Sequence, residues 1–245
     1  MLMQQTLERL QALHLDAMAE ALAMQAKDPA TGKLDFDERV GLLVEAQWTA
    51  REDKRLRRAL TEAKLRMPTA CVEDVDYPPK RELDRAIIRQ LSSCKWIEEH
   101  QNVAVTGPTG TGKSFVACAL AQLACRRGYR ALYRRVPRLF DELTIARADG
   151  TFVRQLARFA RAHVLVLDDF GIGSLREQDR RDLLEILEDR YGSRSTIITS
   201  QLDPKHWHAF IGEPTLADAI CDRLVHNAHR LVLKGPSRRK EEAVK

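Results

Sequence analysis

The stretch Gly107-Pro108-Thr109-Gly110-Thr111-Gly112-Lys113-Ser114 decides the fold of this chain. It matches the pattern G-x-x-x-x-G-K-[ST], in which glycines let backbone N–H groups curl around phosphate oxygens. An apolar, β-branched run (102–106) precedes it, and an Ala-rich helix is expected over 115–126. A helix that begins at such a loop directs the positive end of its dipole at phosphate. The stretch therefore predicts a strand, a phosphate-binding loop (P-loop) and a helix in series.

This loop predicts a site for a nucleoside triphosphate. Lys113 is expected to reach the β- and γ-phosphates and to act as a catalytic residue, while the hydroxyl of Ser114 ligates Mg²⁺. We therefore expect ATP and Mg²⁺ as cofactors. The predicted ATP-binding residues are Gly107, Pro108, Thr109, Gly110, Thr111, Gly112, Lys113, Ser114 and Phe115.

Two further strand ends carry candidate catalytic groups. Val164-Leu165-Val166-Leu167-Asp168-Asp169 predicts a buried strand whose end presents two carboxylates. Asp168 is expected to hold Mg²⁺ through water, and Asp169 to orient or deprotonate the attacking water. In the run 195–201, Thr199, Ser200 or Gln201 is expected to lie between these carboxylates and the γ-phosphate. Ser200 is included among the candidate catalytic residues.

Hydrophobic periodicity divides the chain into a helical front end and an α/β remainder. Leucines and methionines at helical spacing predict a helix from the start of the chain, a break at 28–32, and a second helix from about 35 to 65. From about residue 83, strands alternate with helices, which predicts a parallel α/β sheet with helices on both faces. We expect a helical N-terminal domain over 1–67, a proline-containing linker over 68–82 and an ATPase domain over 83–245.

Basic residues gather in three clusters, at 51–66, at 126–138 and near the C-terminus at 223–245, although the formal net charge of the 245 residues is only +5. Segregated positive charge is typical of proteins with a polyanionic partner, while solvated helix faces are the alternative for any single cluster. Because no helix-turn-helix or zinc-finger pattern is present, we expect backbone contacts with duplex DNA and little base readout. The candidate DNA-binding residues are Arg51, Lys54, Arg55, Arg57, Arg58, Arg134, Arg135 and Arg138.

Composition narrows the class of protein further. Hydrophobic residues make up 44% of the chain and charged residues 31%, which supports a packed core and argues against a disordered chain. We expect no membrane span and no signal peptide, since no apolar run approaches the roughly 18 residues a bilayer requires. The five cysteines show no C-x-x-C pair, so we expect neither a disulfide framework nor a cysteine-ligated metal site, and a cytoplasmic location.

GPTGTGKS, VLVLDDFG, TIITSQL and the later Asp222-Arg223-Leu224 together resemble the AAA+ ATPases. More narrowly, the chain is similar to the clade of DnaC helicase loaders and IstB transposition helper ATPases, over almost its whole length. This resemblance implies an AAA+ P-loop NTPase sheet, ATP hydrolysis, and ATP-dependent self-assembly around duplex DNA with nucleotide between copies. It also implies target-DNA remodelling, and recruitment and stimulation of a partner transposase, with the helical front end contributing DNA and oligomer contacts.

The same resemblance assigns roles to single residues. Arg223 matches the arginine finger that one copy offers to the ATP of the next, and is a candidate catalytic residue. Thr199 and Ser200 fall in the sensor-1 region, and Trp96 and Ile97 would border the adenine. The chain has Asp169 where many AAA+ members have glutamate, and its C-terminal lid is short or absent, which leaves Arg230 as a candidate sensor-2. A DnaC-like helicase loader is the alternative function, and a small-molecule P-loop kinase is a third.

Overall fold

The computed structural model describes residues 2–237, and contacts divide the chain into two compact units, Met1–Arg58 and Ala59–Lys245. The division falls inside one long helix, whereas the sequence placed the domain end at residue 67. The segment 238–245 of the C-terminal basic cluster lies outside the described residues. The first unit contains α1 (Leu2–Ala12), α2 (Asp16–Gln25), the 3-10 turn η1 (Thr31–Lys33) and most of α3 (Phe36–Ala63).

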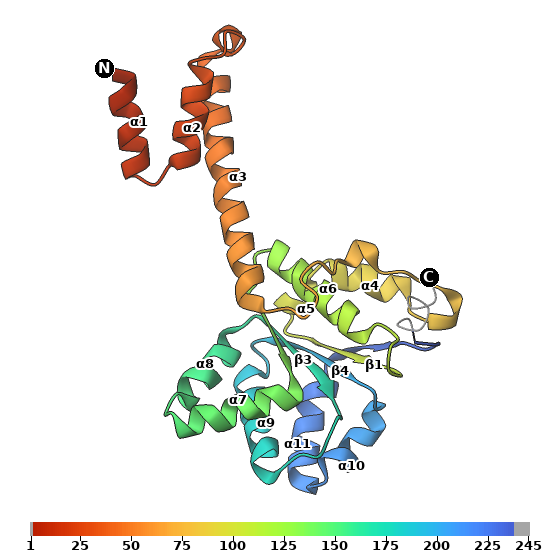
Figure 1. The fold of residues 1–245 in the computed structure, drawn as a ribbon. Helices are drawn as coiled ribbons and strands as arrows, with labels where there is room; N and C mark the ends of the chain where they lie inside the picture. Colours follow the sequence, from red (N-terminus) through yellow and green to blue (C-terminus); the bar gives the residue numbers. More distant parts are fainter. Residues whose placement is uncertain (1, 238–245) are drawn as a thin grey trace. The chain divides into compact units, whose positions relative to one another are not determined.

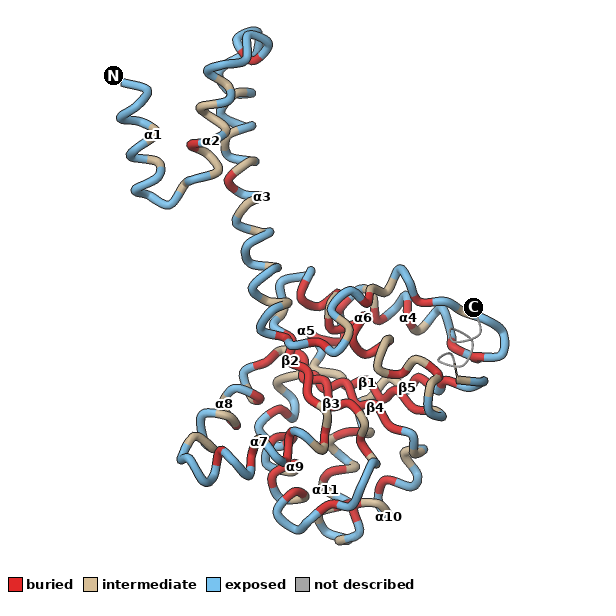
Figure 2. The backbone as a smooth tube through the Cα atoms, viewed as in Figure 1, coloured by how far each residue is buried: buried red, intermediate tan, exposed pale blue. Residues whose placement is uncertain are grey.

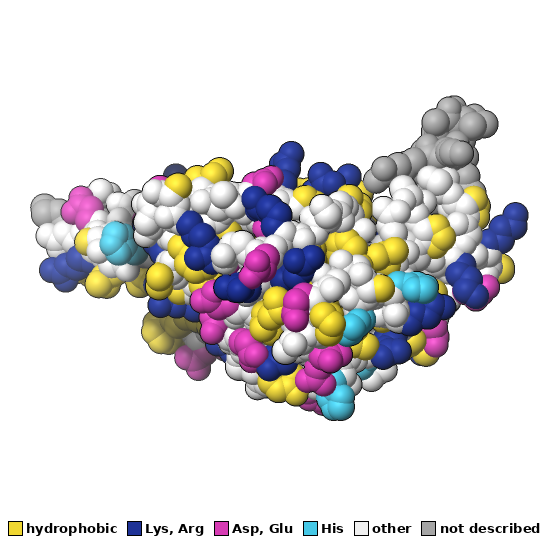
Figure 3. Space-filling view, turned by 90° about the horizontal axis from the view of Figure 1, so that it is seen from below, with side chains coloured by type: hydrophobic (Ala, Val, Ile, Leu, Met, Phe, Trp, Pro, Cys, Tyr) yellow, Lys and Arg dark blue, Asp and Glu magenta, His cyan; other side chains and the backbone are white. Residues whose placement is uncertain are grey.

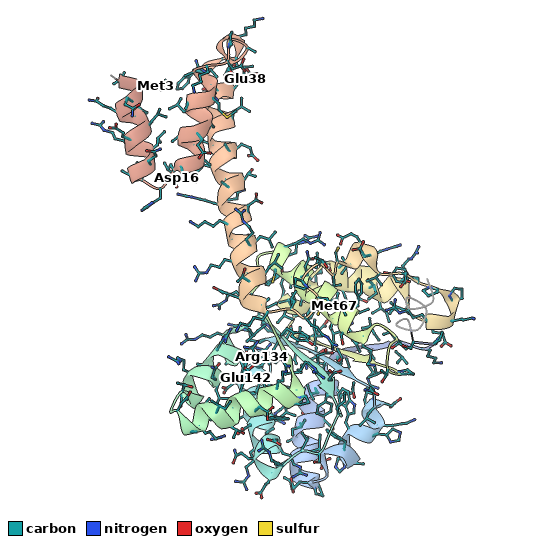
Figure 4. The ribbon with its side chains drawn as sticks, viewed as in Figure 1. Met3, Asp16, Glu38, Met67, Arg134 and Glu142 are labelled. Carbon is teal, nitrogen blue, oxygen red and sulfur yellow. The ribbon has the colours of Figure 1, made fainter. Side chains whose placement is uncertain are left out.

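Local hydrogen bonds explain where the helices of the first unit begin and end. After α1 the chain turns through His14, whose φ of +57° is left-handed; hydrophobic spacing did not predict this break. The predicted break after α2 is present, and there Asp28 accepts a hydrogen bond from the backbone N–H of Ala30 at 2.9 Å. A capping box starts α3: Asp35 Oδ1 accepts from Glu38 N at 2.7 Å, and Glu38 Oε2 accepts from Asp35 N at 3.1 Å. Figure 4 labels Met3, Asp16 and Glu38 in these helices.

The second unit alternates strands with helices, as predicted. Its elements, in chain order, are η2 (Val72–Asp74), η3 (Pro79–Arg81), α4 (Arg85–Ser92), α5 (Lys95–Glu98), β1 (Asn102–Thr106), α6 (Lys113–Arg126), β2 (Ala131–Arg135), α7 (Val136–Ala148), α8 (Phe152–Arg161), β3 (Val164–Phe170), α9 (Glu177–Arg190), β4 (Ser195–Ser200), η4 (Pro204–His206), α10 (Trp207–Ile211), α11 (Pro214–Val225) and β5 (Ala228–Val232).

These strands form one parallel sheet in the order β2-β3-β4-β1-β5. Helices α4, α5 and α6 cover one face, and α7 to α11 cover the other (Figure 1). Every residue of β1 and β4 is buried (Figure 2), as expected for central strands of a parallel sheet covered by helices on both faces. The predicted parallel sheet flanked by helices is therefore confirmed.

Strand β5 was not predicted from the sequence. It is an edge strand, and Leu231 is its one buried residue, so it lacks the apolar run that marks a strand covered on both faces. Its backbone pairs with β1, with Val232 opposite Thr106. Leu233 N then donates to Thr106 O at 2.8 Å, which holds the chain after β5 beside the start of the P-loop.

The parallel topology brings the polar strand ends to one edge of the sheet. β1 ends just before the P-loop, and its neighbour β4 ends at Ser200. The next strand, β3, ends at Asp168–Phe170. The ring of Phe170 packs edge-on against the fully buried Trp207 at 5.2 Å, which anchors this end of β3. In open α/β sheets this carboxyl edge is where ligands bind.

Candidate nucleotide site

Close backbone contacts require two glycines of the P-loop. Gly107 has a φ of +142°, and a Cβ there would lie 2.0 Å from the carbonyl oxygen of Leu233. Gly110 has a φ of +84°, and a Cβ there would lie 2.0 Å from the side chain of Ser237. Residues with a side chain rarely adopt these backbone conformations. The loop therefore keeps a compact path that glycine alone permits at these two positions.

Lys113, the first residue of α6, places its ammonium group within the loop. The residue is 8% exposed, and Nζ donates to Pro108 O at 2.8 Å. Thr111 Oγ1 donates to the same carbonyl at 2.9 Å. Thr109 Oγ1 donates to Gln201 Oε1 at 2.7 Å, which ties the loop to the end of β4. The buried cation lies where the sequence expects the β- and γ-phosphates.

Ser114 and Asp168 meet at the sheet edge although they are 54 positions apart in sequence. Ser114 Oγ lies 2.9 Å from each carboxylate oxygen of Asp168. Asp168 is fully buried and also accepts hydrogen bonds from Thr199 Oγ1 and, at 2.5 Å, from the hydroxyl of Tyr133. Burial raises the pKa of Tyr133, and its hydrogen bond to Asp168 raises it further, so this hydroxyl stays a donor. A serine hydroxyl beside a carboxylate is a donor set suited to Mg²⁺.

Of the three polar residues at the end of β4, Thr199 is the one whose hydroxyl contacts Asp168. Ser200 is buried and directed elsewhere: its Oγ donates to Phe170 O at 2.7 Å and accepts from Leu202 N at 3.0 Å. Neighbouring side chains on a strand point to opposite faces, so only one of Thr199 and Ser200 can face the acid. The position of Ser200 does not agree with the catalytic role predicted for it.

Asp169 has an unusual backbone and two arginine neighbours. Its φ of +63° is left-handed, and its N–H donates to Thr199 Oγ1 at 3.1 Å. Its carboxylate accepts a hydrogen bond from Arg135 Nε at 2.8 Å and lies 3.8 Å from the guanidinium of Arg66. Arg135 was predicted as a DNA contact, and the structure instead pairs it with this acid. Neither arginine was linked to the acids from the sequence.

A cavity of about 300 Å³ opens beside these groups. Its residues fit a nucleoside triphosphate with Mg²⁺, since they combine a buried ammonium group, a helix N-terminus and the hydroxyl of Ser114, which contacts the buried carboxylate of Asp168. Met67, Asp74 and Gln201 also line it, and no sequence motif marked the first two. The lining residues are Met67, Asp74, Thr109, Gly110, Gly112, Lys113, Ser114, Phe115, Asp169 and Gln201.

The two residues predicted to border the adenine lie at the amino ends of the strands, opposite the carboxyl ends where the P-loop begins. Trp96 and Ile97 are buried in the core, and Trp96 O accepts a hydrogen bond from the side chain of Ser195, the first residue of β4. The P-loop follows the last residue of β1 instead. The prediction that Trp96 and Ile97 border the adenine is therefore wrong, because nearness in sequence to β1 placed them beside the wrong end of that strand.

Arg223 also lies far from the P-loop of its own chain. Its carbonyl accepts a hydrogen bond at 2.7 Å from the side chain of Asn102, the first residue of β1. Its guanidinium pairs with Glu188 at 2.5 Å. A role for Arg223 at an ATP therefore requires the ATP of a second copy. Arg230 is exposed on β5 in a depression with Glu82 and does not line the P-loop cavity.

The basic residues predicted on α3 are exposed. Helical spacing puts four of the five on one side of the helix, with Arg57 turned away from them. Arg55 also pairs with Glu52 at 2.7 Å. The exposed residues are Arg51, Lys54, Arg55, Arg57 and Arg58.

Arg134 does not behave as the predicted DNA contact. It is 6% exposed, and its Nε donates to Glu142 at 2.8 Å; the two side chains point toward each other in Figure 4. Burial therefore removes it from the predicted set, while Arg138 is exposed on α7. On the face drawn in Figure 3, Lys and Arg alternate with Asp and Glu and form no continuous basic patch.

The sheet order, the P-loop and the acids of β3 define the class of protein: an AAA+ P-loop NTPase fold. Residues 8–245 match the family described as IstB-like ATP binding protein, and the chain belongs to this family. An insertion sequence ATP-binding protein of Sinorhizobium fredii, y4pL, is 50% identical over 242 residues, 99% of this chain and 98% of the relative.

Two solved structures share the fold over most of this chain. The structure of DnaI matches with a TM-score of 0.59 and 23% identity, over 73% of this chain and 94% of that one. The DnaC helicase loader matches with a TM-score of 0.56 and 22% identity, over 67% of this chain and 97% of that one. Within the part of the chain that the structure describes, no helix is both long and apolar enough to cross a membrane.

Proposed function

We propose that this chain binds ATP and Mg²⁺ in the P-loop cavity, hydrolyses the ATP, and assembles with further copies on duplex DNA. The assembly remodels target DNA and recruits and stimulates a partner transposase. The observation that carries the nucleotide part is the contact of Ser114 Oγ with both oxygens of the buried Asp168 at 2.9 Å. It joins the P-loop to β3 in the arrangement that phosphoryl-transfer sites of this class use.

Each group of the site has a step in this proposal. Lys113 binds the β- and γ-phosphates, and the P-loop backbone cradles them. Mg²⁺, held by Ser114 and Asp168, supplies neutralisation of the charge on the phosphate oxygens. Asp169 orients the attacking water and accepts its proton, with Thr199 fixing the backbone of that acid through its hydroxyl. Since Asp169 pairs with Arg135 at 2.8 Å, its carboxylate exchanges this partner for water before it acts.

Assembly of copies supplies the last group. Arg223 lies at the amino edge of the sheet, opposite its own P-loop, so we propose that it stabilises transition-state charge at the ATP of a neighbouring copy. The exposed basic side of α3 carries the DNA contacts in this proposal, with Arg138 as a further contact. Weak contacts per copy add by avidity when several copies bind one duplex.

The insertion sequence relative supports a role in transposition. It is 50% identical to this chain over an alignment that covers 99% of this chain, helical front end included. The DnaC structure shares the fold at 22% identity and covers 67% of the chain, so it gives weaker support to a helicase loader. A small-molecule kinase is disfavoured because the carboxyl edge carries paired acids and a polar strand end.

A complementation assay tests the shared site. Lys113→Ala removes the phosphate contact and Arg223→Ala removes the finger, so each variant alone is expected to hydrolyse ATP poorly on duplex DNA. Mixed together they are expected to regain activity, because the Lys113→Ala copy offers its Arg223 to the intact P-loop of the other. No gain on mixing, or full activity of Arg223→Ala alone, would contradict the shared site.

Assembly on DNA is tested by particle size. Sedimentation of the chain with duplex DNA is expected to show large complexes with ATP, and smaller ones with ADP or no nucleotide. Adding the partner transposase is expected to raise DNA strand transfer by that transposase only in the sample with ATP. Equal sizes in all three samples, or assembly on a hexameric helicase instead of duplex DNA, would contradict the proposal.

A further inference from the structure

Arg66 belongs to the short segment that leaves α3 and passes the nucleotide cavity. Lys64 ends the helix with a left-handed φ of +51°. Ala63 and Leu65 are buried on either side of it, which fixes the path of the segment on the second unit. Met67, the residue after Arg66, lines the cavity. Figure 4 labels Met67 near the end of α3. Arg66 is therefore held at the cavity by buried neighbours and not by a freely moving chain.

The guanidinium of Arg66 faces both acids of β3. One of its nitrogens lies 3.7 Å from Asp168 Oδ2 and 3.8 Å from Asp169 Oδ2. Tyr133, which donates to Asp168, also interacts with Arg66. The side chain of Arg66 is 36% exposed, so part of it remains accessible. The guanidinium of Arg66 therefore lies beside the two acids where we expect the terminal phosphate and the attacking water.

The two acids do not depend on Arg66 for their hydrogen bonds. Asp168 already accepts from Ser114, Tyr133 and Thr199, and Asp169 has its close pair with Arg135 at 2.8 Å. Distances of 3.7–3.8 Å are ion-pair distances and are longer than hydrogen bonds. A guanidinium carries five N–H donors in a fork that matches phosphate oxygens. The present contacts of Arg66 therefore allow its guanidinium to donate hydrogen bonds to the oxygens of a phosphate.

We propose that Arg66 contacts the terminal phosphate of a nucleoside triphosphate bound to the same chain, and makes the site prefer triphosphate over diphosphate. This inference rests on the proposed ATP site and adds to it a residue from outside the P-loop and the strand ends. Arg66 lies three positions after the last residue of α3, so this phosphate contact comes from the segment that follows the helical front end.

Nucleotide affinity separates this role from a structural one. The affinities of the full chain for AMPPCP and for ADP, each with Mg²⁺, are measured by calorimetry for wild type and for Arg66→Ala. We expect AMPPCP affinity to fall about tenfold, the loss of one charge-assisted hydrogen bond, and ADP affinity to stay within about twofold. Arg66→Lys is expected to keep part of the preference. Lys64→Gln removes one positive charge at a nearby exposed position, as Arg66→Ala does, and is expected to keep the full preference for AMPPCP over ADP.

Three outcomes would overturn the inference. Equal losses for both nucleotides in Arg66→Ala would mean that the residue supports the site only structurally, and unchanged affinities would mean that it does not contact phosphate. Arg66→Lys, which retains the positive charge in the same segment, applies the same test if Arg66→Ala does not fold. Wild-type chain that binds neither nucleotide would overturn the proposed ATP site as well, so the two failures are distinguishable.

Discussion

The two units of the chain differ in how much apolar surface they bury. In the second unit a continuous core includes Phe159, Phe170 and Trp207, each fully buried. In the first unit, α1 has no buried residue and α2 has only Ala19. Phe36 and Trp48 of α3 are 78% and 63% exposed, and Figure 2 shows this unit mostly in the colour of exposed residues.

This difference assigns the nucleotide site to the second unit and an interaction surface to the first. Burial of apolar area is the main source of folding free energy, so the second unit can hold the nucleotide site rigidly. The first unit presents apolar side chains four positions apart along α3, at 36, 40, 44 and 48, and a basic side near its end. Exposed apolar surface of this kind marks an interaction surface.

Trp207 of the second unit and Trp48 of the first provide the largest expected contrast. Trp207→Ala is expected to lower the free energy of unfolding by about 3–5 kcal/mol, because it empties a buried site under Phe170. Trp48→Ala is expected to change it by less than about 0.5 kcal/mol, since Trp48 is exposed. Denaturant unfolding followed by circular dichroism checks both. Similar losses for the two variants would remove the distinction between the units.

Asp169, at the end of β3, tests whether ATP hydrolysis depends on this carboxylate of the second unit. Asp169→Asn keeps the size and removes the base, so kcat for ATP hydrolysis on DNA is expected to fall about 100-fold, near 2.7 kcal/mol in the barrier. ATP affinity is expected to stay within about twofold. Asp53→Asn, the same change on the exposed surface of α3, is expected to have no effect. Unchanged hydrolysis in Asp169→Asn would exclude the acid from the reaction.

The basic side of α3 tests where the protein touches DNA. Replacing Arg51, Lys54 and Arg55 together by alanine is expected to weaken duplex binding more than tenfold at low salt. The slope of log affinity against log salt is expected to become shallower by about 2.7, because each of the three cations neutralises one phosphate and accounts for about 0.9. A matched triple variant at Arg9, Lys27 and Lys33, also exposed and in the first unit, is the control. Equal weakening in both triple variants would mean that net charge alone is responsible.

Neighbouring hydroxyls at the end of β4 give the smallest expected effects. Thr199→Ala removes the contact with Asp168 and is expected to lower kcat about fivefold, a modest share of the range for catalytic groups. Ser200→Ala removes a buried hydrogen bond and is expected to cost about 1 kcal/mol of stability, with kcat nearly unchanged. Steady-state hydrolysis and thermal unfolding separate the two. The reverse pattern would restore Ser200 as the catalytic residue.

Sequence pattern was sufficient where a single segment determines its own structure. The P-loop, the buried strands β1, β3 and β4, and helix α9 all follow from local runs of residues. The front end was also predicted as helical, apart from the break at His14. These features depend on burial and glycine conformation, which act within a few residues of the chain.

Sequence pattern was not sufficient where a structural feature depends on contacts between segments that are far apart in the chain. β5 is an edge strand and lacks an apolar run. The pairing of β3 with β4 brings the hydroxyl of Thr199 to Asp168, and the sequence of either strand alone does not show this. Arg66 was counted in a basic cluster and Arg135 was predicted as a DNA contact, because nothing in the neighbouring sequence shows that they meet the acids of β3. Arg134 was counted in the same way and is buried.

The Mg²⁺ dependence of ATP binding tests the central claim most directly, since the claim is that Ser114 and Asp168 form one cation site beside the P-loop. ATP affinity is measured by titration with and without Mg²⁺ for wild type and Ser114→Ala. We expect Mg²⁺ to tighten binding at least about tenfold in wild type and less than about twofold in the variant. The same tightening in both proteins would contradict the account.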